Sequence, residues 1–186
     1  MKILSYLLSS SIIFLLTACG TESQIDPKRV FDMWDYMTSS SNYEVEYDIY
    51  QNGILTGRDF EVHKQFGNQY EISNANGVVT SSLFLGNNQL LLQEGTDDSN
   101  IIRHVYLGDR GVFQSPFIEL CTFEKFYDRY RTKNSIFYNV IQISCNYRSG
   151  IYKEFYYGYN EGLVSFYEEN GANQLESVKI SENAIF

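Results

Sequence analysis

Positive charge is scarce in this chain. Among its 186 residues, 14 lysines and arginines stand against 23 aspartates and glutamates, and the formal net charge is −9. A protein this acidic has no overall electrostatic attraction for nucleic acid or for an anionic bilayer. The sequence therefore predicts no nucleic-acid partner.

Motifs for known chemistry are missing as well. The chain has no Gly-x-Ser-x-Gly, no phosphate-binding glycine loop and no His-Glu-x-x-His. Its only two histidines, His63 and His104, lie far apart, and the expected strand pattern puts His63 on the solvent side. We therefore expect a non-catalytic protein, with no metal site and no cofactor.

No apolar run reaches the roughly 20 residues that a membrane span needs. The N-terminus instead has Lys2, an apolar segment interrupted by serines over 3–16, and the small residues Thr17 and Ala18 before Cys19. This order is typical of a secretory signal peptide. We predict a signal peptide over 1–18, a tether over 19–25 and a single β-rich domain over 26–186.

The segment Leu16-Thr17-Ala18-Cys19 resembles the lipobox of bacterial lipoproteins. The resemblance implies cleavage before Cys19 and acylation of its sulfur and amine, for which palmitate is the usual label. Two or more chains anchor a protein stably. Gly20 replaces the Asp that usually retains such proteins at the inner membrane, so we expect an outer-membrane lipoprotein on the periplasmic side. Surface exposure, inner-membrane sorting and an unmodified Cys19 left by the ordinary signal peptidase remain alternatives.

Cysteine is also rare, with three in the chain. Apart from Cys19, Cys121 and Cys145 form an even pair in an exported body, which favours a disulfide and an oxidising periplasm. Two buried thiols or an incomplete metal pair are the alternatives. If Lys133-Asn134 is a turn, a hairpin places Cys121 opposite Cys145 and Phe123 opposite Ile143. A helix over 119–131 would not.

Aromatic residues, by contrast, are abundant, with 16 Tyr and 13 Phe. From Tyr43 to Ile49, apolar and acidic residues alternate, as in a strand with one wet face. Asn52-Gly53 is a strong hairpin signal, and further turn signals follow at regular spacing. The predicted fold is mainly β, an antiparallel meander curled into a half-barrel or barrel with one N-terminal amphipathic helix.

That helix is predicted to begin at Asp26-Pro27, an N-cap followed by the first helical residue. Val30, Met33, Trp34 and Met37 then share one apolar face. We expect this face to cover an apolar concavity of the sheet. Trp34, Met33 and Met37 are therefore candidate ligand contacts, with plain core packing as the alternative.

The first predicted hairpin carries an acidic strip of Glu44, Glu46, Asp59 and Glu61. A two-residue turn at Asn52-Gly53 would place Glu46 opposite Asp59 and Glu44 opposite Glu61, and like charges in such positions destabilise a sheet. Three interpretations stay open: a register shift of two residues, a bound cation or basic partner, or a hydrated acidic face.

The order of a lipobox, one helix and a long meander over 26–180 resembles the half-open β-barrel of the periplasmic lipoprotein carrier and its outer-membrane receptor. The segment from Phe155 to Val164 also resembles a hairpin of small envelope lipoproteins. These resemblances imply a membrane-anchored envelope protein that binds an apolar ligand or an acylated partner. The alternative is an interaction or assembly protein with a filled core, acting through protein contacts.

Overall fold

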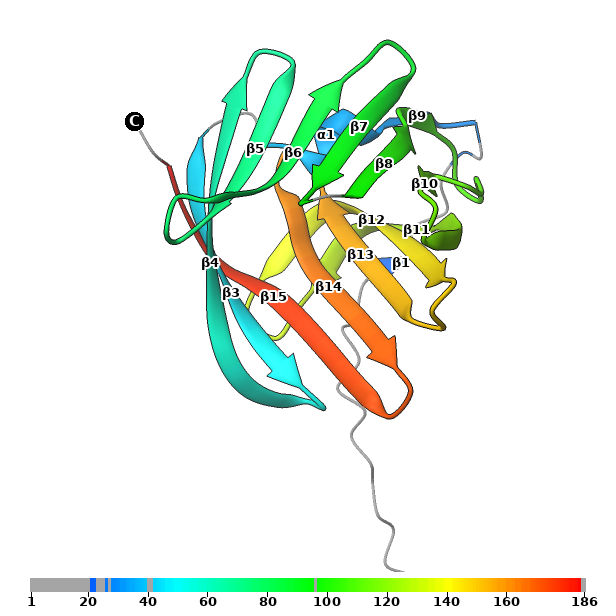
Figure 1. Ribbon diagram of the computed structural model, residues 1–186. Helices are drawn as coiled ribbons and strands as arrows, with labels where there is room; N and C mark the ends of the chain where they lie inside the picture. The colour runs from blue at the N-terminus through cyan, green and yellow to red at the C-terminus, as the bar shows by residue number, and fades with distance from the viewer. Residues whose placement is uncertain (1–20, 23–25, 27, 40–41, 96, 185–186) are drawn as a thin grey trace, which may run out of the picture.

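One long antiparallel sheet makes up nearly all of the computed structural model, which describes residues 21–22, 26, 28–39, 42–95 and 97–184. Thirteen strands follow one another in the order β1-β11-β12-β13-β14-β15-β3-β4-β5-β6-β7-β8-β10. The sheet curls until its ends meet, and β15 joins the C-terminal hairpins to β3 (Figure 1). A mainly β fold curled into a nearly closed barrel, with one small helix, is therefore confirmed.

The elements have the following bounds: β1 Thr21–Glu22, β2 Phe31–Asp32, α1 Met33–Met37, β3 Tyr43–Gln51, β4 Ile54–Phe66, β5 Gln69–Asn74, β6 Val79–Leu85, β7 Gln89–Glu94, β8 Asp97–Ile102, β9 His104–Val105, β10 Phe113–Gln114, β11 Ile118–Arg131, β12 Ile136–Tyr147, β13 Tyr152–Gly158, β14 Gly162–Asn170 and β15 Asn173–Ala184. Strands β2 and β9 form a separate two-stranded sheet. Within the described ranges, no helix has the length and apolar character needed to cross a membrane.

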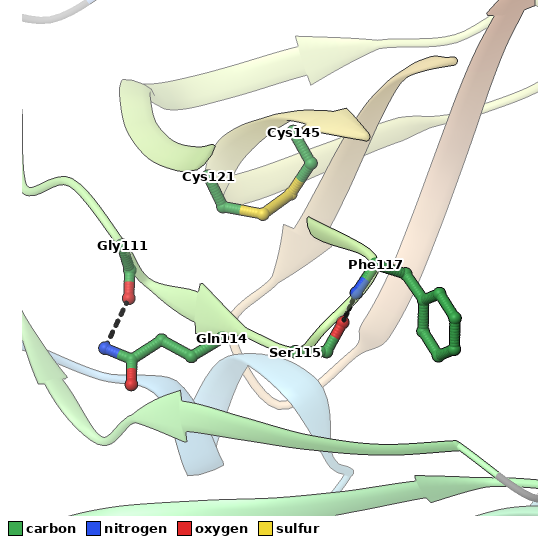
Figure 2. Close-up of a disulfide and its surroundings, with 6 residues drawn as sticks. All are labelled: Gly111, Gln114, Ser115, Phe117, Cys121 and Cys145. Carbon is green, nitrogen blue, oxygen red and sulfur yellow. Dashed lines mark hydrogen bonds between the residues drawn. A yellow bond between two sulfur atoms is a disulfide. The ribbon is translucent and has the colours of Figure 1, made fainter. Parts of the chain in front are cut away.

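The barrel closes where the segment before β10 reaches the free edge of β11. The amide of Gly111 donates to the Cys121 carbonyl at 2.6 Å, and the amide of Phe123 donates to the Asp109 carbonyl at 2.9 Å. Behind this seam, the buried Cys121 and Cys145 are directly paired across β11 and β12 and form a disulfide (Figure 2). The disulfide expected from the sequence is therefore confirmed.

The hairpin of β11 and β12 keeps the predicted pairing of Cys121 with Cys145 and of Phe123 with Ile143. A register shift between Phe123 and Lys125 then places Phe126 opposite Ile141. The backbone of Asn139 has a φ of 52°, an uncommon value outside glycine. Beyond it, the hairpin end lies against the outer face of the sheet and buries a second hydrophobic cluster of Tyr130, Val140 and Val164, with Tyr127, Phe137 and Tyr156 packed around it.

The first hairpin corrects the predicted acidic strip. A register shift beside Tyr50 places Ile49 opposite Gly57, so that the strands slip by one residue and Glu44 and Glu46 face Val62 and Phe60. No like-charge pair forms between these strands. Because a one-residue slip exchanges the two faces of a strand, the side chains at 61 and 63 turn inward, opposite Val45 and Tyr43. The expected solvent position of His63 was wrong for this reason.

The N-terminal helix is much shorter than predicted. Residues 28–30 are not helical, and α1 begins only after Asp32, whose side chain accepts a hydrogen bond from the amide of Trp34 at 3.0 Å. Phe31 and Asp32 are extended because they pair with Val105 and His104 of β9, and Arg103 binds the Asp32 carboxylate at 2.8 Å. Sheet pairing thus overrides the helical periodicity, and Val30 is left 47% exposed.

Reduction of the Cys121–Cys145 disulfide should destabilise the barrel by about 3 kcal/mol, because the bridge closes a loop with a sequence separation of 24 and restricts the unfolded chain. Urea unfolding of protein that begins at Gly20, with and without a reducing agent, would measure this loss. A double Cys121→Ala and Cys145→Ala variant is the control, since the reductant should not affect it. Equal midpoints for the oxidised and reduced proteins would contradict the prediction.

Candidate functional site

A cavity of about 140 Å³ lies inside the barrel, between the strands β4 to β7 and the strands β13 and β14. Its apolar wall comes from alternating inward positions of these strands, and Met37 of α1 contributes from the helix. The lining residues are Met37, Glu61, His63, Tyr70, Ile72, Ser81, Leu83, Leu92, Glu94, Phe155, Tyr157 and Leu163. The cavity thus combines a mostly aliphatic and aromatic wall with two carboxylates.

A chain of hydrogen-bonding side chains runs along one side of the cavity. Glu61 Oε2 lies 2.9 Å from His63 Nε2, and His63 Nδ1 lies 3.0 Å from the Tyr70 hydroxyl. Tyr70 donates to the Tyr43 hydroxyl at 3.2 Å, and the ring of Tyr43 stacks on His63 with a centroid distance of 4.6 Å. Both ring nitrogens of His63 therefore have oxygen partners, which fixes a side chain that is only 2% exposed.

Burial keeps the hydroxyl groups of Tyr43 and Tyr70 neutral. It raises the pKa of the Tyr43 and Tyr70 hydroxyls far above the ordinary value, because a phenolate would lose its hydration inside the barrel. The hydroxyls therefore act as donors and acceptors at any physiological pH. Through His63 they position Glu61, whose side chain is 27% exposed and also lines the cavity.

Glu94 supplies the second carboxylate, from the end of β7. Burial among the surrounding side chains raises its pKa, while the ammonium group of Lys153 opposes that change. Lys153 is itself paired with Glu168 at 3.1 Å. Glu94 is nevertheless an exposed residue at the end of the strand, so its carboxylate keeps contact with water and is accessible to a cation or hydrogen-bond donor that enters the cavity.

The three residues of α1 predicted as ligand contacts occupy different positions. Met37 lines the cavity, whereas Met33 is fully buried and Trp34 is 9% exposed within the main hydrophobic core. The amide of Asn160 donates to the Asp35 carbonyl at 2.7 Å, which holds the helix against the turn between β13 and β14. The structure therefore brings one of the three candidates to the site.

Sequence reasoning missed Glu94 as a site residue, and it placed Glu61 and His63 on the solvent side of the first hairpin rather than inside the barrel. Their signal was the alternation of Glu61, His63 and Gln65 along β4, but the one-residue slip decides which face they take. Of the other acidic residues of the predicted strip, Glu46 is paired with Arg58 at 3.1 Å, and the Asp59 carboxylate accepts a hydrogen bond from the amide of Phe60 at 2.8 Å. The second histidine, His104, is half exposed and lies 3.5 Å from Asp32.

No group of three or more His, Cys, Asp or Glu side chains suited to a metal ion occurs in the part of the chain that the structure describes. The predicted lipobox, Leu16-Thr17-Ala18-Cys19, lies outside the described residues. The tether over 19–25 is described only at Thr21 and Glu22.

Comparison with known proteins shows the fold. No protein-family model and no curated protein matches the sequence. A crystal structure from Parabacteroides distasonis, of a protein described as a "putative lipoprotein", aligns with a TM-score of 0.50 and 11% identity over 79% of this chain and 97% of that one. An exported protein from Bacteroides fragilis described as having a YmcC-like fold aligns at a TM-score of 0.38 and 12% identity, over 80% and 98% of the two chains. Only the first similarity is close enough to indicate a shared barrel fold.

Replacement of Trp34 by Ala should destabilise the protein by about 3–5 kcal/mol, because a large side chain would leave a void in the core. The matched control is Val30→Ala, on the same segment but 47% exposed, which should change stability by no more than about 0.5 kcal/mol. Urea unfolding followed by circular dichroism would measure both variants. Equal stability of the two would show that α1 does not belong to the core.

Proposed function

We propose that this protein is a lipoprotein anchored in the cell envelope through Cys19, and that its barrel binds the apolar end of a small ligand or of an acylated partner. The cavity inside the barrel is the observation that carries the binding function. We place the protein at the periplasmic side of the outer membrane. Its role is non-catalytic.

The anchor is supported by the lipobox at Leu16-Thr17-Ala18-Cys19. A protein of similar barrel fold, from Parabacteroides distasonis, is itself described as a "putative lipoprotein". The Cys121–Cys145 disulfide fits an oxidising compartment outside the cytoplasm. Gly20, in place of the aspartate of the retention signal, supports the outer membrane.

The dimensions of the cavity limit the ligand. A volume of about 140 Å³ is close to that of a cavity that accepts benzene and is well below the roughly 300 Å³ at which sites for larger organic ligands begin. A ring or a chain of about six carbons fits, and a longer acyl chain would enter only by its end. Glu61 and Glu94 would repel a carboxylate head group and attract an amine or another hydrogen-bond donor.

A non-catalytic role is supported by the state of the polar chain. Both ring nitrogens of His63 are already bonded, and the Tyr70 hydroxyl donates to the Tyr43 hydroxyl. An envelope interaction protein is the alternative function. It is favoured by the dense packing of the rest of the barrel interior, where a single buried core extends from Phe31 to Tyr157.

The anchor is tested by Cys19→Ser in the full-length protein. Loss of the lipid should release the protein from the membrane fraction, and radiolabelled palmitate should enter the wild type only, since a stable attachment requires the acyl chains. A double Cys121→Ser and Cys145→Ser variant is the control, because it removes the other two cysteines together and keeps the anchor. Unlabelled wild-type protein that stays in the membrane to the same extent as Cys19→Ser would refute the anchor.

The cavity is tested with hexylamine, hexanol and hexanoate as probes, with affinities measured by calorimetry. Hexylamine should bind most tightly and hexanoate least, because of the carboxylates of Glu61 and Glu94. Ser81→Trp, on the cavity wall, should weaken hexylamine binding at least about tenfold. Ser82→Trp is the matched control, since the neighbouring side chain lies on the opposite face of β6 and is not among the lining residues.

Three results would separate the functions. Equal affinity of hexylamine for the Ser81→Trp and Ser82→Trp variants would show that the probe binds outside this cavity. No binding of any probe to a stably folded wild type would favour the interaction protein. Native mass spectrometry of the protein purified from its own membrane would then show whether a lipid or a protein accompanies it.

A further inference from the structure

We infer that one outer face of the barrel, at the end of the β11–β12 hairpin, lies directly on the bilayer that holds the lipid anchor. This bilayer face consists of Arg129, Arg131, Ile136 and Tyr138. The inference depends on the proposed acylation of Cys19, and it adds the orientation of the barrel to that proposal.

The position of β1 limits how far this face can lie from the anchor. Thr21 pairs with Arg129 and Glu22 with Tyr127, so the chain enters the sheet beside the bilayer face. Only Gly20 separates Thr21 from Cys19. Since an extended residue spans at most about 3.6 Å, the Cα atom of Cys19 lies within roughly 7 Å of that of Thr21. The barrel therefore cannot stand away from the membrane on a long tether.

The direction of β1 adds to this argument. Because β1 and β11 are antiparallel, the N-terminal end of β1 is directed toward Arg131 and the turn after it. Arg131 pairs with Ile136, and Arg129 pairs with Tyr138. All four residues of the bilayer face thus lie around the point where the anchor joins the sheet.

The two sides of the hairpin end differ in exposure. Tyr130 and Phe137, which pair with one another, turn toward the second hydrophobic cluster. The pairs on either side, Arg129 with Tyr138 and Arg131 with Ile136, turn away from that cluster. Tyr138 is 61% exposed and Ile136 is 38% exposed. Cross-strand partners share a face, so the exposed apolar side chains are interleaved with the two arginines.

This composition matches the interfacial region of a bilayer. Tyrosine prefers the headgroup level, and arginine can place its stem along apolar surface while its guanidinium binds phosphate. The net charge of −9 opposes a general attraction to anionic lipid. Arg129 and Arg131 place two positive charges at the point where the anchor would hold the protein within a Debye length of the lipid.

The hairpin end is fixed to the barrel, so that its contact with lipid would orient the whole domain. The Asn134 side chain donates to Asp48 at 3.0 Å, and Lys133 pairs with Glu176 while its ammonium lies 3.7 Å from the ring centroid of Tyr50. The turn between β11 and β12 is therefore bound to strands β3 and β15. A flexible loop would offer no such orientation.

The test uses full-length acylated protein in vesicles of phosphatidylethanolamine and phosphatidylglycerol. Tyr138→Cys is labelled with an environment-sensitive fluorophore, and a spin-labelled lipid is the quencher. The matched control is Val78→Cys, which is 60% exposed in the wild type and precedes β6, a strand that pairs only with β5 and β7. Quenching at 138 should exceed quenching at 78 at least about twofold, since interfacial groups lie within reach of the acyl boundary.

Charge reversal provides a second measurement. Arg129→Glu combined with Arg131→Glu should reduce the quenching at 138 to the level of the control site, whereas Lys64→Glu on the exposed part of β4 should leave it unchanged. Equal quenching at 138 and 78 in acylated wild-type protein would overturn the bilayer face and leave the anchor intact. An intact mass without acyl chains on Cys19 would overturn the anchor and the bilayer face together.

Discussion

Closure of the curled sheet at the edge of β11 is the constraint on which the rest of the structure depends. An open edge exposes unpaired amides and carbonyls and invites pairing with other chains. Here the segment before β10 covers that edge at Cys121 and Phe123, and β1 covers it farther along at Tyr127 and Arg129. The disulfide holds β11 to β12 immediately behind the seam.

The interior that closure creates is not uniformly apolar. Glu61, His63, Tyr70 and Tyr43 form a connected polar chain within it, and every buried side-chain nitrogen and oxygen in the described part of the protein has a partner. Such a network stabilises a single arrangement when it is complete and is costly when one member is removed. Glu61 connects this rigid chain to the cavity, which is why the proposed ligand chemistry depends on it.

Side-chain packing also fixes the outer surface of the barrel, at the end of the β11–β12 hairpin. The second cluster around Tyr130 and Val164 holds the end of the β11–β12 hairpin against the sheet, and Asn139, with a φ of 52°, lies in β12 beside this cluster. One side of the hairpin is thereby buried. The other side is presented beside β1, so that the place where the chain enters the fold and the face proposed to meet lipid are set by one packing contact.

The sequence by itself determined what its short-range patterns encode. Alternation from Tyr43 to Ile49, the turn residues and the opposed cysteines were enough for an antiparallel β meander with a disulfide, because strand periodicity and hairpin pairing are local properties. Tertiary structure alone decided the rest. The helix at Asp26 was lost to the pairing of Phe31 with Val105, a contact across more than seventy positions, and the one-residue slip beside Tyr50 turned Glu61 and His63 inward. Neither long-range pairing nor a bulge leaves a periodic signature, so only packing could reveal which side chains form the cavity.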